Sequence, residues 1–387
     1  MSSKSIIDLS RNGLSLIDPF VFGKCEVIQT LNLTVNNLTK LDSRSFYGML
    51  NLKKLCLSFN QITKIESDVF HELNWLNFLD LSHNLIKNLD VNLFDNLQNL
   101  EYIDLGSNQI QSLEPETFKN LKELGRLILN NNKLKSLDPL FHNLSSLTFL
   151  DVSSNQITTV HNETFTKLNK LKIIFIFYNQ ISEINAETFK GADNLEELQI
   201  YNNQIGSIHK NFSINLPNLK ELSMAKNNLS LIDPDSFNHF NKLKILRLFE
   251  CNLKSINLSL LVNLEFLSLS NNEITFFSQN LIQLKTLILQ SNHLVNLSYP
   301  LITSQNSSLE ELNLSFCRLI YIDFTILRNF TNLQTLKLYG NNIKYDETTF
   351  HGFKRLTIVF LFENNTTNLT SLFPNINFKI FTSKNND

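Results

Sequence analysis

The sequence has little of several residue types that common folds depend on. Three of its 387 residues are alanine, the strongest helix former, so a bundle of ordinary helices is excluded. Nine glycines leave little material for loops that cradle phosphate groups. The formal net charge of −2 is far from the basic excess of nucleic-acid binders. Because no run of 18 apolar residues occurs, we expect no membrane-spanning helix in this chain.

Leucine and asparagine dominate the composition instead. Their 70 and 55 copies make up 32% of the chain, and 42% of all residues are apolar, so the chain is not a disordered one. An excess of two residue types indicates one unit copied many times. Residues 76–86 show this unit as L-x-x-L-x-L-x-x-N-x-I, with its asparagine at position 84.

The unit recurs about 16 times over residues 4–370, and its asparagine marks a fixed position in each copy. Most successive copies are 24 residues apart, but the steps from 251 to 272 and from 272 to 292 are 21 and 20 residues long. Cysteine replaces asparagine twice. We call these the ladder positions: Asn12, Asn36, Asn60, Asn84, Asn108, Asn132, Asn155, Asn179, Asn203, Asn227, Cys251, Asn272, Asn292, Cys317, Asn341 and Asn364.

Each part of the unit has a physical role. The L-x-L segment alternates with period two, which predicts a short strand with Leu79 and Leu81 inward and Phe78, Asp80 and Ser82 outward. Stacked copies place these strands in one parallel sheet, about 4.8 Å apart. The ladder asparagine follows the strand, where its amide can satisfy buried backbone groups of the turns.

Phenylalanine recurs ten residues after the ladder position and predicts a stacked spine on the convex side. Its members are Phe22, Phe46, Phe70, Phe94, Phe118, Phe165, Phe189 and Phe237, with Phe141, Phe212 and Phe350 one place earlier. The fold class that follows is an α/β-type solenoid with a concave parallel β-sheet, convex loops, short turns and few regular helices.

This pattern resembles the leucine-rich repeat family in its typical class of 24-residue, phenylalanine-containing repeats, and the resemblance covers nearly the whole chain. The resemblance implies a horseshoe whose concave face binds a protein or other macromolecular ligand. Similar repeats form the ectodomains of Toll-like receptors and other extracellular animal proteins, so a receptor-like ectodomain or a fragment of one is implied. An intracellular scaffold or adaptor and a secreted matrix or adhesion protein stay open, as does dimer formation.

The features at the ends and the glycosylation signals bear on the compartment. Residues 1–5 contain no apolar segment of a secretory signal, and residues 371–387 are expected to form a partial last repeat or an irregular end. Fourteen N-x-S/T sequons occur, against about 8 to 9 expected by chance from this composition. Residues 38–142 carry none, and Asn32 and Asn313 are expected to point outward on the sheet. We expect a piece of a longer extracellular or cell-surface protein, with a cytoplasmic protein as the alternative.

Cysteine and catalytic motifs are sparse. Cys25, Cys56, Cys251 and Cys317 form no C-x-x-C pair, and the last two would lie about 14 Å apart across three strands, too far for a disulfide. We expect structural thiols, with a free thiol at Cys56, and no metal site. The eight histidines show no H-E-x-x-H, and the nucleotide and hydrolase motifs are missing, so we expect neither an enzyme nor a cofactor.

The outward strand positions carry the first candidate binding surface. Several aromatic residues, expected to be exposed there, indicate a binding patch. Asp80 and Asp104 are predicted neighbours about 5 Å apart, and their repulsion favours a partner with basic and apolar groups. The alternative is a common L-D-L-S variant of the repeat, solvated and without a partner. This central patch comprises Phe78, Asp80, Tyr102, Asp104, Phe149, Asp151, Phe175, Phe177, Tyr178 and Tyr201.

The irregular region 245–325 carries a second candidate. Its two short repeats lose the regular phenylalanine and must change the local curvature, which predicts a functional kink or, alternatively, a repeat that has decayed without constraint. The second patch comprises Arg247, Phe249, Phe266 and Phe316.

Overall fold

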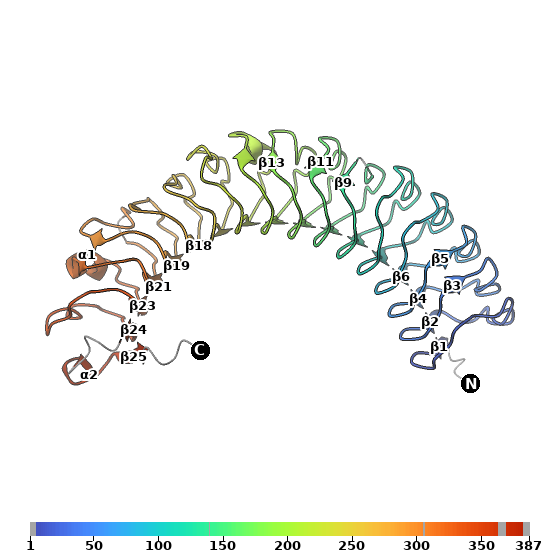
Figure 1. The fold of residues 1–387 in the computed structure, drawn as a ribbon, viewed down its shortest axis with the longest axis horizontal. Coiled ribbons are helices and arrows are strands. Elements are labelled where there is room, and N and C mark those ends of the chain that lie inside the picture. Colours follow the sequence, from blue (N-terminus) through green and yellow to red (C-terminus); the bar gives the residue numbers. More distant parts are fainter. Residues whose placement is uncertain (1–4, 139, 305, 363–368, 382–387) are drawn as a thin grey trace. The chain divides into compact units, whose positions relative to one another are not determined.

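A computed structural model describes residues 5–138, 140–304, 306–362 and 369–381, so the ladder position Asn364 lies outside the described residues. The chain divides into two compact units, Met1–Gln199 and Ile200–Asp387. In each unit, short parallel strands follow the inner side of an arc, and turns and loops form its outer side (Figure 1). The predicted solenoid of parallel strands with few helices is therefore confirmed, and we call the solvent-facing side of each inner sheet its concave face.

The first unit holds nine strands on its inner side. They are β1 (Ile6–Asp8), β2 (Thr30–Asn32), β4 (Lys54–Cys56), β6 (Phe78–Asp80), β7 (Tyr102–Asp104), β8 (Arg126–Ile128), β10 (Phe149–Asp151), β12 (Ile173–Phe175) and β14 (Glu197–Gln199). Two-residue strands lie elsewhere in the repeats: β3 (Lys40–Leu41) pairs with β5 (Lys64–Ile65), β9 (Ser136–Leu137) pairs with β11 (Thr159–Val160), and β13 spans Glu183–Ile184.

The second unit continues the same pattern. Its inner strands are β16 (Glu221–Ser223), β17 (Ile245–Arg247), β18 (Phe266–Ser268), β19 (Thr286–Ile288), β21 (Glu311–Asn313), β23 (Thr335–Lys337), β24 (Ile358–Phe362) and β25 (Asn377–Phe381). The remaining elements are β15 (Ser207–Ile208), the 3-10 turn η1 (Phe212–Asn215), β20 (Asn296–Leu297), β22 (Tyr321–Ile322), α1 (Phe324–Arg328) and α2 (Leu369–Leu372). The last strand, β25, pairs with β24 in parallel over five residues.

Strand register follows the repeat, because equivalent residues of neighbouring copies pair. In β6 and β7, Phe78 pairs with Tyr102 and Asp80 with Asp104. The middle residue of each three-residue inner strand faces the core, and Leu79 and Ile103 are both 0% exposed. Outward residues therefore form columns that run across the strands on the concave face.

The phenylalanine spine fills the convex side of each core. Phe46 and Phe70 stack at 6.1 Å between ring centroids, and Phe165 and Phe189 stack at 5.6 Å. All four rings are at most 1% exposed, so each repeat buries one large apolar group against its neighbours. This packing offsets the lack of regular helices on that side.

The ladder residue Asn60 shows how neighbouring repeats are joined. Its Nδ2 donates to the carbonyl of Leu57 in its own repeat and to that of Leu33 in the preceding one, both at 3.0 Å. Its Oδ1 accepts from the Leu38 N–H, also at 3.0 Å. The amide thus satisfies three buried backbone groups that no strand pairs. Asn12, in the first turn, is exposed and donates to the carbonyl of Ser10 in its own turn.

The two cysteine ladder positions satisfy the buried backbone groups of their turns in a different way. The Cys251 thiol donates to the carbonyl of Met224, but it offers no equivalent of the amide oxygen. The Leu229 N–H donates instead to the Cys251 backbone carbonyl at 2.9 Å. Both flanking residues, Glu250 and Asn252, have φ of 56°, in the left-handed region. Among the described asparagine ladder positions after Asn12, only the preceding residue is left-handed. Left-handed flanks at Phe316 and Arg318 accompany Cys317 in the same way.

The short repeats contain a buried polar anchor that sequence reasoning missed. The Gln279 Oε1 accepts from the Leu258 N–H at 2.8 Å, and its Nε2 donates to the carbonyl of Ile256 at 3.0 Å. Gln279 is 8% exposed. A glutamine in a convex segment thus takes over the role of a ladder amide where the phenylalanine is lost.

Candidate binding surface

The central patch begins with a stacked pair on β6 and β7. The rings of Phe78 and Tyr102 lie 4.4 Å apart at 4° to each other, and the Lys54 ammonium lies 4.4 Å from the Phe78 centroid. Strand pairing positions all three side chains, because they occupy the same outward place in successive repeats. The result is a column in which a cation caps two stacked rings.

A second aromatic group lies on β10 and β12. The Phe149 ring meets the edge of Phe175 at 5.2 Å, and Phe177 lies 5.8 Å from Phe175 and 5.7 Å from Tyr178. The Arg126 guanidinium lies 4.0 Å over the Phe149 ring. The structure therefore brings four predicted aromatic residues into contact, with an arginine between them and the first pair.

The exposure of these rings differs from the sequence expectation. Phe149 is buried, at 9% exposed, because Arg126 covers one side of it and Phe175 another. Most other members of the patch are half-buried, and Tyr178 is 52% exposed. Tyr201 is half-buried and belongs to the second unit. Stacking within the columns accounts for the partial burial, which a repeat pattern alone does not reveal.

Three carboxylates lie among the rings. Asp80 accepts from the N–H and hydroxyl of Ser82, and Asp151 accepts in the same way from Ser153. Asp104 accepts from the Gly106 N–H at 2.8 Å and from the Tyr102 hydroxyl at 3.3 Å. Within the described residues, none of the three carboxylates forms a direct ion pair.

Burial and charge shift the acidity of these groups. Burial raises the pKa of the Asp104 carboxyl above its ordinary value, and the nearby Asp80 raises it further. Burial also raises the pKa of Asp151, and burial together with Asp104 raises that of Tyr102 to about 12. A cation placed on this face would stabilise the charged carboxylates.

Gly106 keeps the surface open beside this acidic pair. A Cβ at this position would lie 2.2 Å from the Asn130 amide oxygen and 3.0 Å from the Asp104 Oδ1. A side chain here would displace both groups. This glycine was not among the predicted site residues, although the repeat pattern predicts that position 106 points outward.

The second patch does not form one surface. Arg247 pairs with Glu221 and lies 5.2 Å over the Phe266 ring. Phe249 is half-buried on the same strand end. Phe316, 43% exposed, instead meets Tyr339 at 5.1 Å and packs where a Cβ on Gly340 would sit. Arg247 and Phe266 are therefore brought together, and Phe316 belongs to a different group.

That other group lies at the last strands and was missed in the sequence. Tyr339 lies 5.1 Å from Phe381, which stacks with Phe360 at 6.0 Å, and the Lys337 ammonium lies 5.4 Å over Phe360. These residues occupy the same outward places as the central patch. Aromatic residues at these outward positions are present in the sequence, but the repeat pattern that would identify them is weaker in this part of the chain.

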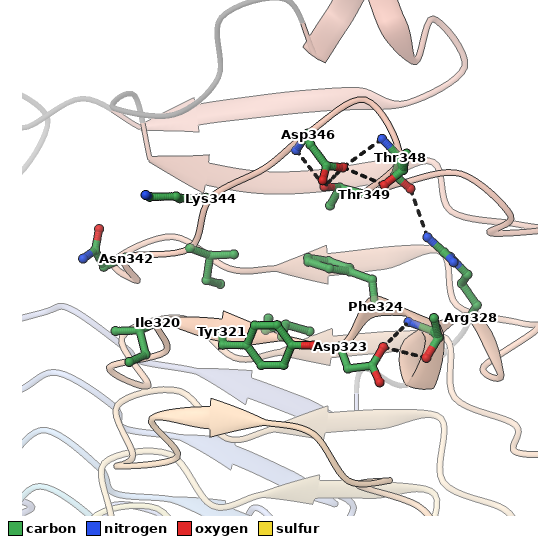
Figure 2. Close-up of a pocket in the computed structure, with 13 residues that line it drawn as sticks. Ile320, Tyr321, Asp323, Phe324, Arg328, Asn342, Lys344, Asp346, Thr348 and Thr349 are labelled. Carbon is green, nitrogen blue, oxygen red and sulfur yellow. Dashed lines mark hydrogen bonds between the residues drawn. The ribbon is translucent and has the colours of Figure 1, made fainter.

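A hollow of about 700 Å³ lies on a flank of the second unit, between the turns that follow β22 and the ladder position Asn341 (Figure 2). The Arg328 guanidinium joins the two turns by donating to the carbonyl of Thr348 at 3.0 Å. Asp323 accepts from Thr325, and Asp346 accepts from Thr348 and Thr349, so each carboxylate closes its own turn. The hollow is lined by polar and apolar side chains alike, and its carboxylates serve the local fold.

The part of the chain that the structure describes carries neither a metal-binding cluster nor a membrane-spanning helix. Those residues hold no group of three histidine, cysteine or acidic side chains that could bind a metal ion. None of their helices is long and apolar enough to cross a bilayer. All four cysteines are free thiols.

The fold and its repeat agree with a family comparison. A leucine rich repeat model matches residues 5–62, 26–86, 50–110, 76–134, 98–157, 145–205 and 193–253, and a second leucine rich repeat model matches residues 308–330. These matches cover more than half of the chain, which therefore belongs to the leucine-rich repeat family. The comparison with curated proteins gives no match.

Solved structures with the same fold come from bacteria and from an animal. A leucine-rich repeat protein of Leptospira interrogans is 27% identical, with a TM-score of 0.82 over 96% of this chain and 95% of that one. An internalin of Listeria monocytogenes is 23% identical, with a TM-score of 0.63 over 86% and 87%. Toll, in the Toll–Spatzle complex of Drosophila, is 18% identical, with a TM-score of 0.73 over 95% of this chain and 56% of that one. The last two likenesses concern the fold alone.

Proposed function

We propose that this chain is a protein-binding module that engages a partner bearing basic and apolar side chains through the central patch. The main support is the environment of Asp80, Asp104 and Asp151. These carboxylates lie half-buried among aromatic rings and, in the described residues, form no direct ion pair. Apart from the buried Phe149, the residues of this patch are half-buried or exposed, so their chemistry is accessible to a partner.

The physical reason lies in desolvation. A carboxylate that burial has partly removed from water gains from a cation at hydrogen-bond distance, and a guanidinium can also stack on the neighbouring rings. Asp104 and Tyr102 offer both features side by side. Lys54 and Arg126 flank them and would repel a second cation outside the acidic pair, which restricts where a basic side chain can dock.

Selection from a displayed random-peptide library against the full chain tests this proposal. We expect selected peptides to be rich in arginine or lysine together with aromatic or aliphatic residues. Asp80→Asn with Asp104→Asn should weaken these peptides about tenfold or more, as expected for loss of a charge-assisted contact. Phe175→Ser with Phe177→Ser should weaken them as well. Glu116→Gln, on an exposed loop, should leave their affinity unchanged. Equal affinity for all variants would contradict the proposal.

Binding should also depend on pH in a defined direction. The pKa values of Asp104 and Asp151 are raised, so these groups begin to take up protons at a higher pH than an ordinary aspartate. Protonation removes the negative charge that a basic partner needs, and affinity should therefore fall as the pH is lowered through this range. Titration calorimetry at several pH values checks this, and affinity that rises on acidification would count against the acidic site.

For the setting of this function, we infer a receptor-like ectodomain or a fragment of one, with an intracellular scaffold and a secreted matrix protein as alternatives. Toll, which has the same fold, is found in a complex with Spatzle. Several sequon asparagines, including Asn37, Asn162 and Asn228, are exposed and accessible to a glycan. Asn313, expected to point outward, is 5% exposed, and its amide donates to the Gln290 side chain at 3.0 Å.

Expression through a secretory pathway, followed by glycosidase treatment and peptide mass spectrometry, tests this setting. Glycans are expected at exposed sequons, and Asn313 should stay unmodified. A chain that carries no glycan after secretion would count against an extracellular origin.

A further inference from the structure

The third and fourth residues after each ladder position, here called the flank positions, change character along the chain. In the seven repeats with ladder positions 36 to 179, they hold only polar or charged residues, such as Thr63 and Lys64. In three consecutive repeats of the second unit, they include Phe276, Val295, Ile320 and Tyr321. Because the fold accepts polar residues at the flank positions, the core does not require the apolar ones.

These four side chains are exposed and follow one another along the second unit. Phe276 is 58% exposed, Val295 42%, Ile320 57% and Tyr321 54%. Val295 and Ile320 lie side by side, because the Ile320 N–H donates to the Val295 carbonyl at 2.9 Å. The Tyr299 ring adds to the group and lies 4.4 Å from the Phe276 ring. We call these five residues the apolar stripe, since contiguous exposed apolar groups of this kind mark interaction surfaces.

The backbone at Val295 is a second and independent sign of a binding role. Its φ is 56°, in the left-handed region, where a β-branched residue is strained. Val295 is the one flank residue, among those the structure describes, with such a φ. Its exposed side chain adds little core packing that would offset the strain. Since residues in strained conformations cluster at binding sites, this valine indicates a use for its side chain at the surface.

The charges around the apolar stripe are mainly positive. Lys254 and Lys344 occupy flank positions of the preceding and the following repeat, and Arg318 lies two residues before Ile320. All three cations are exposed and, within the described residues, form no ion pair. Over the four residues that follow each of these five ladder positions, the one carboxylate is that of Glu273. The surface therefore complements a partner that is apolar in the middle and acidic around it.

We propose that the apolar stripe binds an acidic amphipathic helix of a partner protein, which lies across successive repeats. An α-helix rises about 5.4 Å per turn, and neighbouring repeats are about 4.8 Å apart at the sheet and further apart toward the outer side of the arc (Figure 1). One apolar residue per helical turn thus meets one repeat. The four repeat steps from Lys254 to Lys344 correspond to about four turns, so carboxylates at the two ends of this helix reach both lysines.

The hollow of about 700 Å³ provides a recess at one end of the stripe. Ile320 and Tyr321 line it from one turn and Lys344 from the next (Figure 2). Its carboxylates, Asp323 and Asp346, already accept hydrogen bonds from threonines of their own turns. A large apolar side chain of the partner helix fits between the two turns, where a buried anchor contributes most to binding.

This surface is distinct from the central patch in position and in charge. The stripe belongs to the second unit and requires an acidic partner, whereas the carboxylates of the central patch belong to the first unit and require a basic one. Either form of binding can therefore fail without the other. The sequon residue Asn296 pairs with Tyr321 in β20 and β22, so a glycan at Asn296 would cover part of the stripe. The test accordingly uses the full chain produced without glycans.

Selection from a displayed library of single amphipathic helices tests the proposal. Helices are kept if they bind the wild type and not the double variant Val295→Asn with Ile320→Thr. We expect the kept helices to carry one apolar residue per turn and an excess of glutamate and aspartate. Val295→Asn alone should weaken them at least tenfold in fluorescence anisotropy, although it relieves the left-handed strain and should not lower the free energy of unfolding. A merely structural role of Val295 would not separate affinity from stability in this way.

Charge reversals test the acidic character of the partner. Lys254→Glu with Lys344→Glu should weaken the kept helices at least tenfold. Lys87→Glu with Lys135→Glu makes the same change at exposed flank positions of the first unit and should leave their affinity unchanged.

Several outcomes overturn the proposal. They are a selection that keeps no helix, kept helices without an acidic excess, and affinity that the reversal of Lys254 and Lys344 leaves unchanged. Phosphatidylserine vesicles that bind the wild type but not the double variant would identify a membrane surface as the occupant instead. A mass in sedimentation velocity that rises with concentration only when the stripe is intact would identify a second copy of the chain.

Discussion

At the residue scale, the ladder shows how one side chain replaces several backbone partners. Asn108 donates to the carbonyls of Leu81 and Leu105 and accepts from the Ile86 N–H, at 3.0 to 3.1 Å. These three groups are buried and belong to turns, where no strand can pair them. Cysteine at the same position provides only the donor, and the backbone changes conformation to provide the acceptor.

Asn108→Ala should therefore be strongly destabilising. It leaves buried groups unpaired in two repeats, and a single unpaired buried group costs about 1–3 kcal/mol. Asn88→Ala, at an exposed position of the same unit, should change the free energy of unfolding by less than about 0.5 kcal/mol. Urea unfolding followed by circular dichroism measures both variants. Equal midpoints would show that the ladder residue Asn108 does not stabilise the fold.

The buried thiols should be inert in the folded protein. Burial raises the pKa of Cys251 and of Cys317 to about 12, so at pH 8 the reactive thiolate is on the order of one molecule in ten thousand. Cys56 is half-exposed on the concave face, and burial raises its pKa as well. Iodoacetamide at pH 8 should modify Cys56 before Cys251 and Cys317, at a rate that increases with pH. Modification of Cys251 before unfolding, read by mass spectrometry, would contradict this order.

At the element scale, most inner strands are three residues long and owe their stability to stacking. The convex spine contributes most of the large buried side chains, and Phe237 is 0% exposed, in edge contact with Phe212 at 6.2 Å. Repeat elements of this kind cannot bury their apolar face alone, so each repeat stabilises its neighbours.

Phe237→Ala should cost about 3–5 kcal/mol, because it opens a cavity in a packed core. Leu231→Ala lies six residues earlier in the same repeat and removes a side chain that is 88% exposed. We expect this control to shift the free energy of unfolding by less than about 0.5 kcal/mol. Chemical denaturation measures the free energy of unfolding of both variants. If Phe237→Ala lowers it no more than Leu231→Ala does, the stacked phenylalanines do not stabilise the core.

The sequence predicted the strands and the core because their residue types repeat at a fixed spacing. Each inner leucine is defined by its place in the unit, so the register of Leu79 with Ile103 followed directly. The burial of Phe149 could not be predicted, because it depends on how the Arg126 side chain folds over the ring. Gln279 was missed for a similar reason, since its partners lie in a different repeat at an irregular spacing. Contacts between variable positions depend on rotamers, which the period does not encode.

At the scale of the whole molecule, contacts join mainly neighbouring repeats. Among the described residues, β1 and β25 each pair with one neighbouring repeat and interior strands pair with two, so local stability should be lowest next to β1 and β25. The half-buried Leu9 and the exposed Ile380 are the structural signs of this difference. Fraying from the edges is the expected mode of opening.

Hydrogen exchange measured by mass spectrometry should show this gradient. Amides around β1 and β25 should exchange fastest among the inner strands, and those of β6 and β7 slowest, at low protein concentration. Uniform protection along the chain would contradict the nearest-neighbour account.

The backbone carbonyl that replaces the missing amide at Cys251 and Cys317 has a consequence for how such a chain can change over time. A mutation that removes a ladder asparagine does not have to be reversed, because a left-handed residue on its C-terminal side restores the lost acceptor. The neighbouring short steps show that the convex segment can also lose three or four residues while the strands keep their register. Single repeats can therefore change in length and in sequence independently of one another. New outward residues can arise on the concave face while the core beneath them stays the same.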